Sequence, residues 1–188
     1  LKTTNNKQRT TNNERTMDKQ IIIPVTPEAI APVADTSPEK AILANLKEHL
    51  AEVPGIRYID QDWGQLDDYS PNFPVQWPCV LIDVSTINYS NLGQDAMRVP
   101  ANRQQGEAQL TVKVANLKLT NSSSMAGIDQ QQDAAAIHEL RQHVHNKLHG
   151  YRPGEQASKL IRTAMQRIRR DDGVQEYEIS YSFALYNV

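Results

Sequence analysis

The sequence has few of the residues on which several classes of protein depend. It contains one cysteine, Cys79, which excludes an intramolecular disulfide framework and fits a reducing cytoplasm. The longest early apolar run, Ile21–Ile23, is far shorter than the roughly 20 residues of a membrane helix. It is also too short for the core of a signal peptide. We therefore expect no membrane partner and a protein that stays in the compartment where it is made.

Charge of one sign is scarce as well, because the formal net charge is −2 and 22% of the residues are charged. Such a balance gives no bulk attraction to nucleic acid. Glycine-rich phosphate loops, nucleophile elbows and cysteine–histidine pairs with a catalytic context do not occur. We therefore predict that the protein is not an enzyme, with no catalytic residue and no cofactor.

Two groups of residues have the chemistry of metal ligands. Asp60, Asp62, Asp67 and Asp68 supply carboxylates, but their spacing does not match a calcium loop. His138, His145 and His149 fall on one expected solvent-facing helix side, without the HExxH pattern of zinc proteases. We predict no metal site and keep a metal-dependent enzyme using the histidine-rich helix as a less favoured alternative.

The chain divides into an N-terminal arm, residues 1–36, and a single domain, residues 37–188. Residues 1–16 are almost wholly polar and basic, so we expect them to be disordered, either as leader sequence before Met17 or as a binding arm. Residues 20–36 contain Pro24, Pro27 and Pro32, which favour an extended conformation.

The domain is expected to begin with a helix. Ser37, Pro38 and Glu39 give a helix-start signal, and Pro54-Gly55 ends the pattern. The apolar stripe consists of Ile42, Leu43, Leu46, Leu50 and Val53. His49 is interpreted as a solvated surface residue. A short strand is expected at 56–59. The segment 60–77, which contains Trp63, Tyr69, Phe73 and Trp77, is expected to be irregular and to cap a core or meet a partner.

Two long strands follow, at 79–90 and 106–119, joined by a loop at 91–105. Alternation in the second strand changes phase after Val114-Ala115, which indicates a β-bulge. A polar loop at 120–132 leads to a helix that Asp133 caps and that ends at His149-Gly150. Its buried stripe is expected to consist of Ile137, Leu140, Val144 and Leu148.

The last thirty or so residues predict a β-hairpin, with Asp172-Gly173 as a two-residue loop. Counting outwards pairs Arg169 with Glu176, and Arg167 with Glu178. The residues Tyr177, Ile179, Tyr181, Phe183 and Leu185 then share one apolar face. Because two of the arginines at 162, 167, 169 and 170 thus have glutamate partners, we interpret these arginines as a structural basic ladder. We expect no specific nucleic-acid partner.

These elements predict an α+β fold. We expect an antiparallel sheet of about four or five strands, with two main helices packed on one face, long loops and a C-terminal β-hairpin. Long loops on a rigid sheet are common sites of function. Because they carry apolar anchors in polar surroundings, we predict protein contacts at Met97, Arg98, Val99, Met125 and Ile128.

The order of elements resembles that of phage tail-terminator (tail-completion) proteins, including those of Mu-like prophages. The local likeness is greatest at 38–43, PEKAIL, and at 173–181, GVQEYEISY, and the pattern covers about 37–188. The arm before Ser37 and the aromatic segment at 60–77 depart from the compact family pattern.

The resemblance implies a hexameric ring that caps the tail tube and joins it to the head-neck connector protein. It implies a virion protein of the tail-neck region that assembles in the bacterial cytoplasm. The alternative within virions is another neck or tail-tube-associated structural protein.

Overall fold

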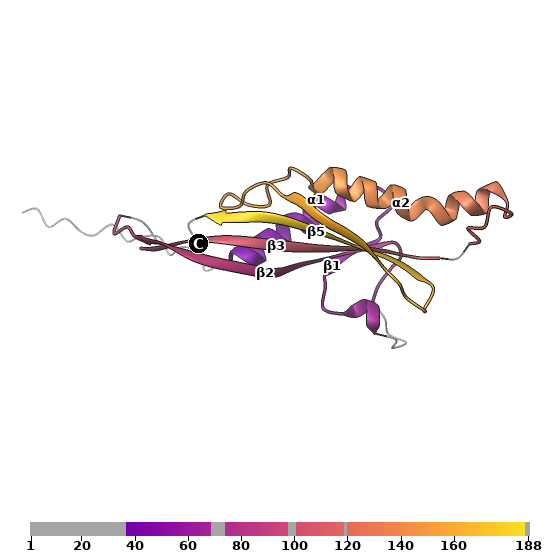
Figure 1. Cartoon of the computed structure of the whole chain (residues 1–188), viewed down its shortest axis with the longest axis horizontal. Helices are drawn as coiled ribbons and strands as arrows, with labels where there is room; N and C mark the ends of the chain where they lie inside the picture. The colour runs from indigo at the N-terminus through magenta and orange to yellow at the C-terminus, as the bar shows by residue number, and fades with distance from the viewer. Residues whose placement is uncertain (1–36, 69–73, 98–100, 119, 187–188) are drawn as a thin grey trace, which may run out of the picture. The chain divides into compact units, whose positions relative to one another are not determined.

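The computed structural model describes residues 37–68, 74–97, 101–118 and 120–186, which form one sheet with two long helices (Figure 1). The elements in chain order are α1 (Pro38–Ala51), β1 (Tyr58–Gln61), the 3-10 helix η1 (Gln65–Asp67), β2 (Cys79–Gln94), β3 (Asn102–Leu117), α2 (Ile128–Leu148), β4 (Ile161–Ile168) and β5 (Val174–Tyr186). The predicted α+β class is confirmed. The arm expected at 1–36 lies outside the described residues.

The strand order in the five-stranded sheet is β1-β2-β3-β5-β4. Neighbouring strands from β2 to β4 run antiparallel, as expected, whereas β1 pairs in parallel with residues 79–82 of β2. A parallel pair needs a long crossover connection, and the segment at 62–78, which contains η1, supplies it. The sheet is therefore mixed rather than wholly antiparallel.

Both helices pack on one face of the sheet, as predicted. In α1, Ile42, Leu46 and Leu50 are buried, and the predicted stripe of α2 is confirmed with Ala134 added. These side chains join the alternating apolar residues of β2, β3 and β5 in one core cluster. The apolar face predicted for β5, from Tyr177 to Leu185, is buried in this cluster.

A second, smaller cluster covers the opposite sheet face at one end. It consists of Leu66, Val75, Cys79, Leu81 and Ala115, with Trp77 packed against it. Val114 and Ala115 are consequently both buried, one on each face. The bulge predicted there is wrong, because β3 pairs with β5 without interruption. The irregularities of the β2–β3 ladder lie in β2 instead, at Val84/Thr86 and Asn91/Gly93.

The β2–β3 hairpin is longer than the sequence predicts. Pairing continues out to Gln94 and Asn102, so the connecting loop is 95–101 rather than 91–105. Helix α2 also begins earlier than predicted, at Ile128 rather than after Asp133. The Gln131 N–H donates to the Gly127 carbonyl (3.1 Å), and the Gln131 side chain donates to the Ala126 carbonyl (2.7 Å). These bonds extend the helix through glutamines that have reasonable helix propensity.

The register predicted between β4 and β5 is wrong by one residue at 164–168, and by two at Ile161 and Arg162, beyond an irregularity between Arg162 and Ala164. Ile168 lies opposite Glu176, Arg167 opposite Tyr177 and Gln166 opposite Glu178. An odd number of residues therefore separates the paired positions, which a two-residue loop cannot provide. Gly173 has a φ of 78°, and the Val174 N–H donates to Asp172 Oδ1 (3.0 Å). A left-handed glycine after the turn is typical of three-residue hairpin loops.

Candidate functional site

The described side chains that we predicted as protein contacts are all exposed. Met97 is 94% exposed, Met125 is 92% and Ile128 is 72%. Arg98 and Val99 lie outside the described residues. Apolar side chains with this exposure are suited to burial against a partner, so the prediction of contacts stands without a direct test.

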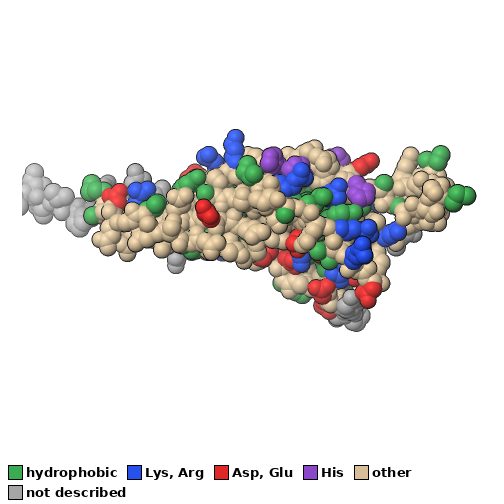
Figure 2. Space-filling view, in the orientation of Figure 1, with side chains coloured by type: hydrophobic (Ala, Val, Ile, Leu, Met, Phe, Trp, Pro, Cys, Tyr) green, Lys and Arg blue, Asp and Glu red, His purple; other side chains and the backbone are tan. Residues whose placement is uncertain are grey.

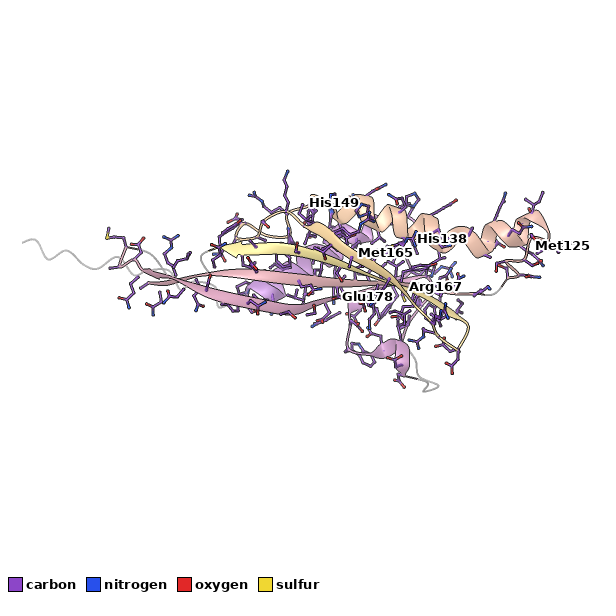
Figure 3. The ribbon with its side chains drawn as sticks, viewed as in Figure 1. Met125, His138, His149, Met165, Arg167 and Glu178 are labelled. Carbon is purple, nitrogen blue, oxygen red and sulfur yellow. The ribbon has the colours of Figure 1, made fainter. Side chains whose placement is uncertain are left out.

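The two loops that carry these residues lie at opposite ends of the sheet. The loop at 95–101 precedes β3, and the segment at 118–127 follows it. Figure 3 shows Met125 beside the N-terminal end of α2. Because β3 has 16 residues, the two loops are roughly 50 Å apart along the strand. They therefore form two separate surfaces rather than one patch.

The sheet has an open edge on each side among the residues that the structure describes. On one side, β1 covers only residues 79–82 of β2, and residues 83–94 pair solely with β3. On the other side, β4 pairs solely with β5. Seven of the eight β4 residues are exposed, including Ile161 and Met165 at 49% and 45%. Unpaired edges of this kind are templates for pairing with another strand.

The aspartates of the acidic segment have cationic partners instead of a metal-binding arrangement. Asp60 lies 2.6 Å from Lys47, Asp62 lies 2.6 Å from Lys113, and Asp67 contacts Arg170. Burial alone raises the pKa of Asp60, but the hydrogen bonds from Lys47, the Gln61 backbone and Tyr58, with the charge of Lys47, together lower it. Among the described residues, no group of three or more His, Cys, Asp or Glu has the arrangement of a metal site.

Arg170 is a structural residue whose role the sequence does not reveal. Its guanidinium donates to Asp67 (2.8 Å), Asp172 (2.8 Å) and Glu176 (3.0 Å), and also to the Leu66 carbonyl (2.5 Å). Burial raises the pKa of Glu176, and the hydrogen bond from Arg170 partly offsets that rise. This cluster ties the β4–β5 loop to η1. Glu176, the partner that we predicted for Arg169, therefore pairs with Arg170 instead.

The histidines of α2 face the sheet more than predicted. His138 meets the Tyr177 ring edge-on at 5.6 Å, and His145 Nδ1 lies 3.3 Å from the Tyr181 hydroxyl oxygen. His149 Nδ1 accepts the Arg162 backbone N–H at 3.3 Å. Residues three or four positions apart lie on the same side of a helix, so the three histidines lie next to the buried apolar stripe of α2. Their side of the helix therefore borders β5 and β4. His138 and His149 are nevertheless exposed, as predicted, and only His145 is half-buried, so the predicted solvent-facing side is wrong for His145 alone.

His49 differs in the same way from its predicted solvated state. Its ring stacks on Tyr151 at 3.7 Å between centroids, and its Nε2–H donates to the Lys147 carbonyl at 3.0 Å. The Asn45 side chain donates to the Pro153 carbonyl nearby. These contacts join α1 to the end of α2 and to the connector that follows it.

Basic side chains lie beside the α2 histidines. Arg141 lies over the Tyr177 ring, 4.7 Å from its centroid, while Arg162 and Arg167 are opposite Tyr181 and Tyr177 in the β4–β5 ladder. Burial is the main cause that lowers the pKa of His145, and the charges of Arg162 and His149 lower it further. Burial raises the pKa of Tyr181 to about 12, so its hydroxyl stays protonated. We name the set of His138, Arg141, His145, His149, Arg162 and Arg167 the α2–β4 surface.

The comparisons with known proteins give a weak likeness of structure. No helix in the described part of the chain is long and apolar enough to cross a membrane. No protein-family model matches the sequence, and no curated protein matches it. A solved structure titled "Virion of native gene transfer agent (GTA) particle" contains a similar chain. It is 11% identical, covers 77% of this chain and 93% of its own length, and has a TM-score of 0.39. This likeness is too weak to assign a family or a function.

Proposed function

We propose that the protein is a structural component of a phage-like virion, a tail terminator whose copies form a ring. In this role the ring caps the tail tube and joins it to the head-neck connector. The family resemblance implies that the ring is a hexamer. The observation that carries the proposal is the pair of open strand edges on opposite sides of one sheet.

The two edges belong to different strands, so contact between them is heterologous. From β2 through β3 and β5 to β4, each neighbour is antiparallel, and β4 therefore runs opposite to β2. When β4 of one copy meets β2 of the next with the helices on the same face, the strands pair antiparallel. A heterologous contact repeated between identical copies closes into a ring or continues as a filament.

The positions of the edges favour closure. Traced through the paired residues of β5 and β3, Ile161 of β4 lies level with Thr86 of β2, and Ile168 lies level with Cys79. The open edge of β2, residues 83–94, is centred several residues further along the strand. Pairing of β4 with this edge therefore shifts each copy by about 20 Å along the strand direction relative to its neighbour. One copy contributes about 19 Å of sheet width across its strands. The resulting strand tilt is about 45°, which is similar to that of closed barrels.

The exposed apolar anchors fit contacts along the ring axis. Met97 at one end of β3 and Met125 with Ile128 at the other end present separate surfaces. A protein between a tube and a connector needs one surface for each of them. Another neck or tube-associated structural protein would use the same surfaces, and electron microscopy of labelled particles distinguishes these positions.

Cysteine cross-linking tests the lateral contact. Asn88→Cys on β2 and Ala164→Cys on β4 place thiols on the two open edges, on the face away from the helices. Within one chain, two strands lie between them, a separation of about 14 Å that a disulfide does not span. The buried Cys79 thiol does not compete, because burial raises its pKa to about 12. Oxidation of the double variant is expected to give a covalent ladder that ends at one closed species.

The single variants are the matched controls. In a head-to-tail ring, neither N88C nor A164C alone forms disulfide-linked dimers. Dimers of A164C alone indicate two-fold β4–β4 pairing, which contradicts the ring. A double variant that stays monomeric on oxidation, by light scattering and by gel, both alone and with tail tubes, contradicts it as well.

A further inference from the structure

The open edge of β4 presents a cation and an apolar side chain on the helix-covered face of the sheet. Figure 2 shows histidine and basic side chains over α2 and the neighbouring strands, and Figure 3 labels Met165 and Arg167 on β4. Arg162 and Met165 lie opposite Tyr181 and Ile179, which are both buried in the main core. Arg162 is exposed, and Met165 is 45% exposed. This edge therefore has side chains that a neighbouring molecule can contact.

Arg162 lacks a carboxylate partner within its own copy. It belongs to none of the ion pairs in the part of the chain that the structure describes, in contrast to Arg170. Its backbone N–H donates to His149, but its side chain is exposed. A guanidinium matches the planar geometry of a carboxylate and also stacks on aromatic faces. The partner that fits Arg162 is thus a carboxylate beside an aromatic ring on another molecule.

Tyr89 and Glu39 form such a pair at the opposite edge of the sheet. Tyr89 lies on the open part of β2, is 47% exposed, and donates its hydroxyl to Glu39 Oε1 at 3.3 Å. The hydrogen bond from Ser37, above all, holds the pKa of Glu39 below its ordinary value, so its carboxylate is ionised. Ile87 and Tyr89 both border the position that a Cβ would take at Gly106, so their side chains share the helix-covered face.

The register of the proposed subunit contact brings the two edges into correspondence. In the register that the cysteine pair tests, Ala164 of one copy faces residue 88 of the next, and antiparallel counting places Met165 opposite Ile87. The irregularity between Arg162 and Ala164 moves Arg162 to the next paired position, as it does in the β4–β5 ladder. Arg162 is then opposite Tyr89, and methionine meets isoleucine on the same face.

Backbone pairing alone does not fix this register. Each edge offers the same N–H and C=O groups along its length, and a slip of two residues keeps every side chain on its own face. Such a slip moves Arg162 away from Glu39, however, and it changes the stagger between copies. Stagger and strand number are linked in any closed sheet, so the register also determines where a ring closes.

We propose that Arg162 of one copy binds Glu39 and the Tyr89 ring of the next copy and so fixes the register of the strand pair. The inference rests on the proposed ring and names the side chains that determine its closure. The partner is a second copy of this chain, because the cation and the anion lie on the two edges that the ring contact joins.

Disulfide mapping of the full chain with a reversed charge tests the proposal. Arg162→Glu is introduced into N88C/A164C, which reports the expected register, and into S90C/A164C, which reports a slip of two residues. An exposed ion pair changes an equilibrium by a factor of up to about five. We therefore expect the N88C/A164C product to fall by about this factor in R162E, while the S90C/A164C product increases.

Exchange of the two charges separates a direct pair from a structural effect. R162E/E39R is expected to restore the N88C/A164C product, because the ion pair forms again with its signs exchanged. Lys118→Glu is the matched control, since it reverses an exposed positive charge at the far end of β3, and both products are expected to stay as in the unaltered background. Thermal unfolding shows that each variant is folded.

Two results overturn the proposal. The first is an unchanged N88C/A164C product in R162E, and the second is a product in R162E/E39R that is no higher than in R162E. If E39R unfolds, the cycle of R162Q, E39Q and R162Q/E39Q decides instead, because losses that simply add exclude the pair. Failure of the ring is a distinct outcome, in which N88C/A164C gives no intermolecular product even with Arg162 and Glu39 in place, and it overturns this inference as well.

Discussion

At the scale of single residues, Arg170 shows how far side-chain chemistry is from being readable in the sequence. It is one of a run of arginines before an Asp-Asp-Gly turn, and nothing in that pattern separates it from Arg169. The fold does so by closing η1 over the turn, which leaves the Arg170 side chain 9% exposed and Arg169 exposed. Tertiary packing, which local periodicity does not encode, therefore decides which arginine is structural.

Replacement of Arg170 by alanine is expected to destabilise the fold by about 3–5 kcal/mol, because Glu176 is left buried without its partner. Urea unfolding followed by circular dichroism measures the change. Arg169→Ala is the matched control and is expected to change stability by less than about 0.5 kcal/mol. The double variant R170M/E176Q is expected to recover part of the loss. Equal losses for the two single arginine variants would rule out the assigned role.

His145 predicts a pH dependence of stability. Its pKa is lowered below the ordinary 6.5 by burial, Arg162 and His149, so the unfolded chain binds a proton more readily than the folded protein. Stability from this residue is thus complete above the unfolded pKa and decreases as the pH falls below about 6.5. The melting temperature is expected to fall between pH 7.5 and 5.5, with a shallower slope in His145→Gln. Identical slopes in the two proteins would contradict this prediction.

At the scale of elements, the regular spacing of apolar residues was sufficient to predict a helix or strand wherever one of its faces is buried. The stripes of α1 and α2, the apolar face of β5 and the existence of the C-terminal hairpin followed from it. The parallel pairing of β1, which was expected only as a short strand at 56–59, did not follow from it. Nor did the second cluster, because Leu66, Val75 and Trp77 come from a stretch of sequence without a regular period. The strand ends of the β2–β3 hairpin were also missed, since polar residues there pair through the backbone alone.

Gly173 predicts a test of the β4–β5 loop geometry. Its φ of 78° is open to glycine and costs other residues about 1–2 kcal/mol. We expect Gly173→Ala to destabilise by about that amount, Gly173→Val by more and Gly173→Asn by less, since asparagine tolerates this conformation best. Chemical unfolding gives the order. Gly154→Ala is the control, because that glycine is not left-handed and an added Cβ meets only Ile42 at 3.8 Å. A neutral Gly173→Val would contradict the loop conformation.

At the scale of the whole molecule, the exposed apolar residues that we predict as contacts were recognisable in the sequence, but their arrangement was not. Apolar side chains in polar loops mark Met97 and Met125 without any structure. Their separation depends on the length of β3 and on its central place in the sheet. The glutamate partners predicted for Arg167 and Arg169 were wrong because of the register error, since each slip of a strand exchanges all its cross-strand neighbours.

The central position of β3 has a mechanical consequence. Its backbone joins the loop that carries Met97 to the segment that carries Met125, and it is bonded along its length to β2 and β5. Tension applied between these two ends loads the hydrogen bonds of both ladders in shear, so that many must rupture together. Tension applied across the β4–β5 hairpin would instead open one bond after another. The molecule is thereby stiffest along β3, which is the direction in which tension acts if it links a tube to a connector as we propose.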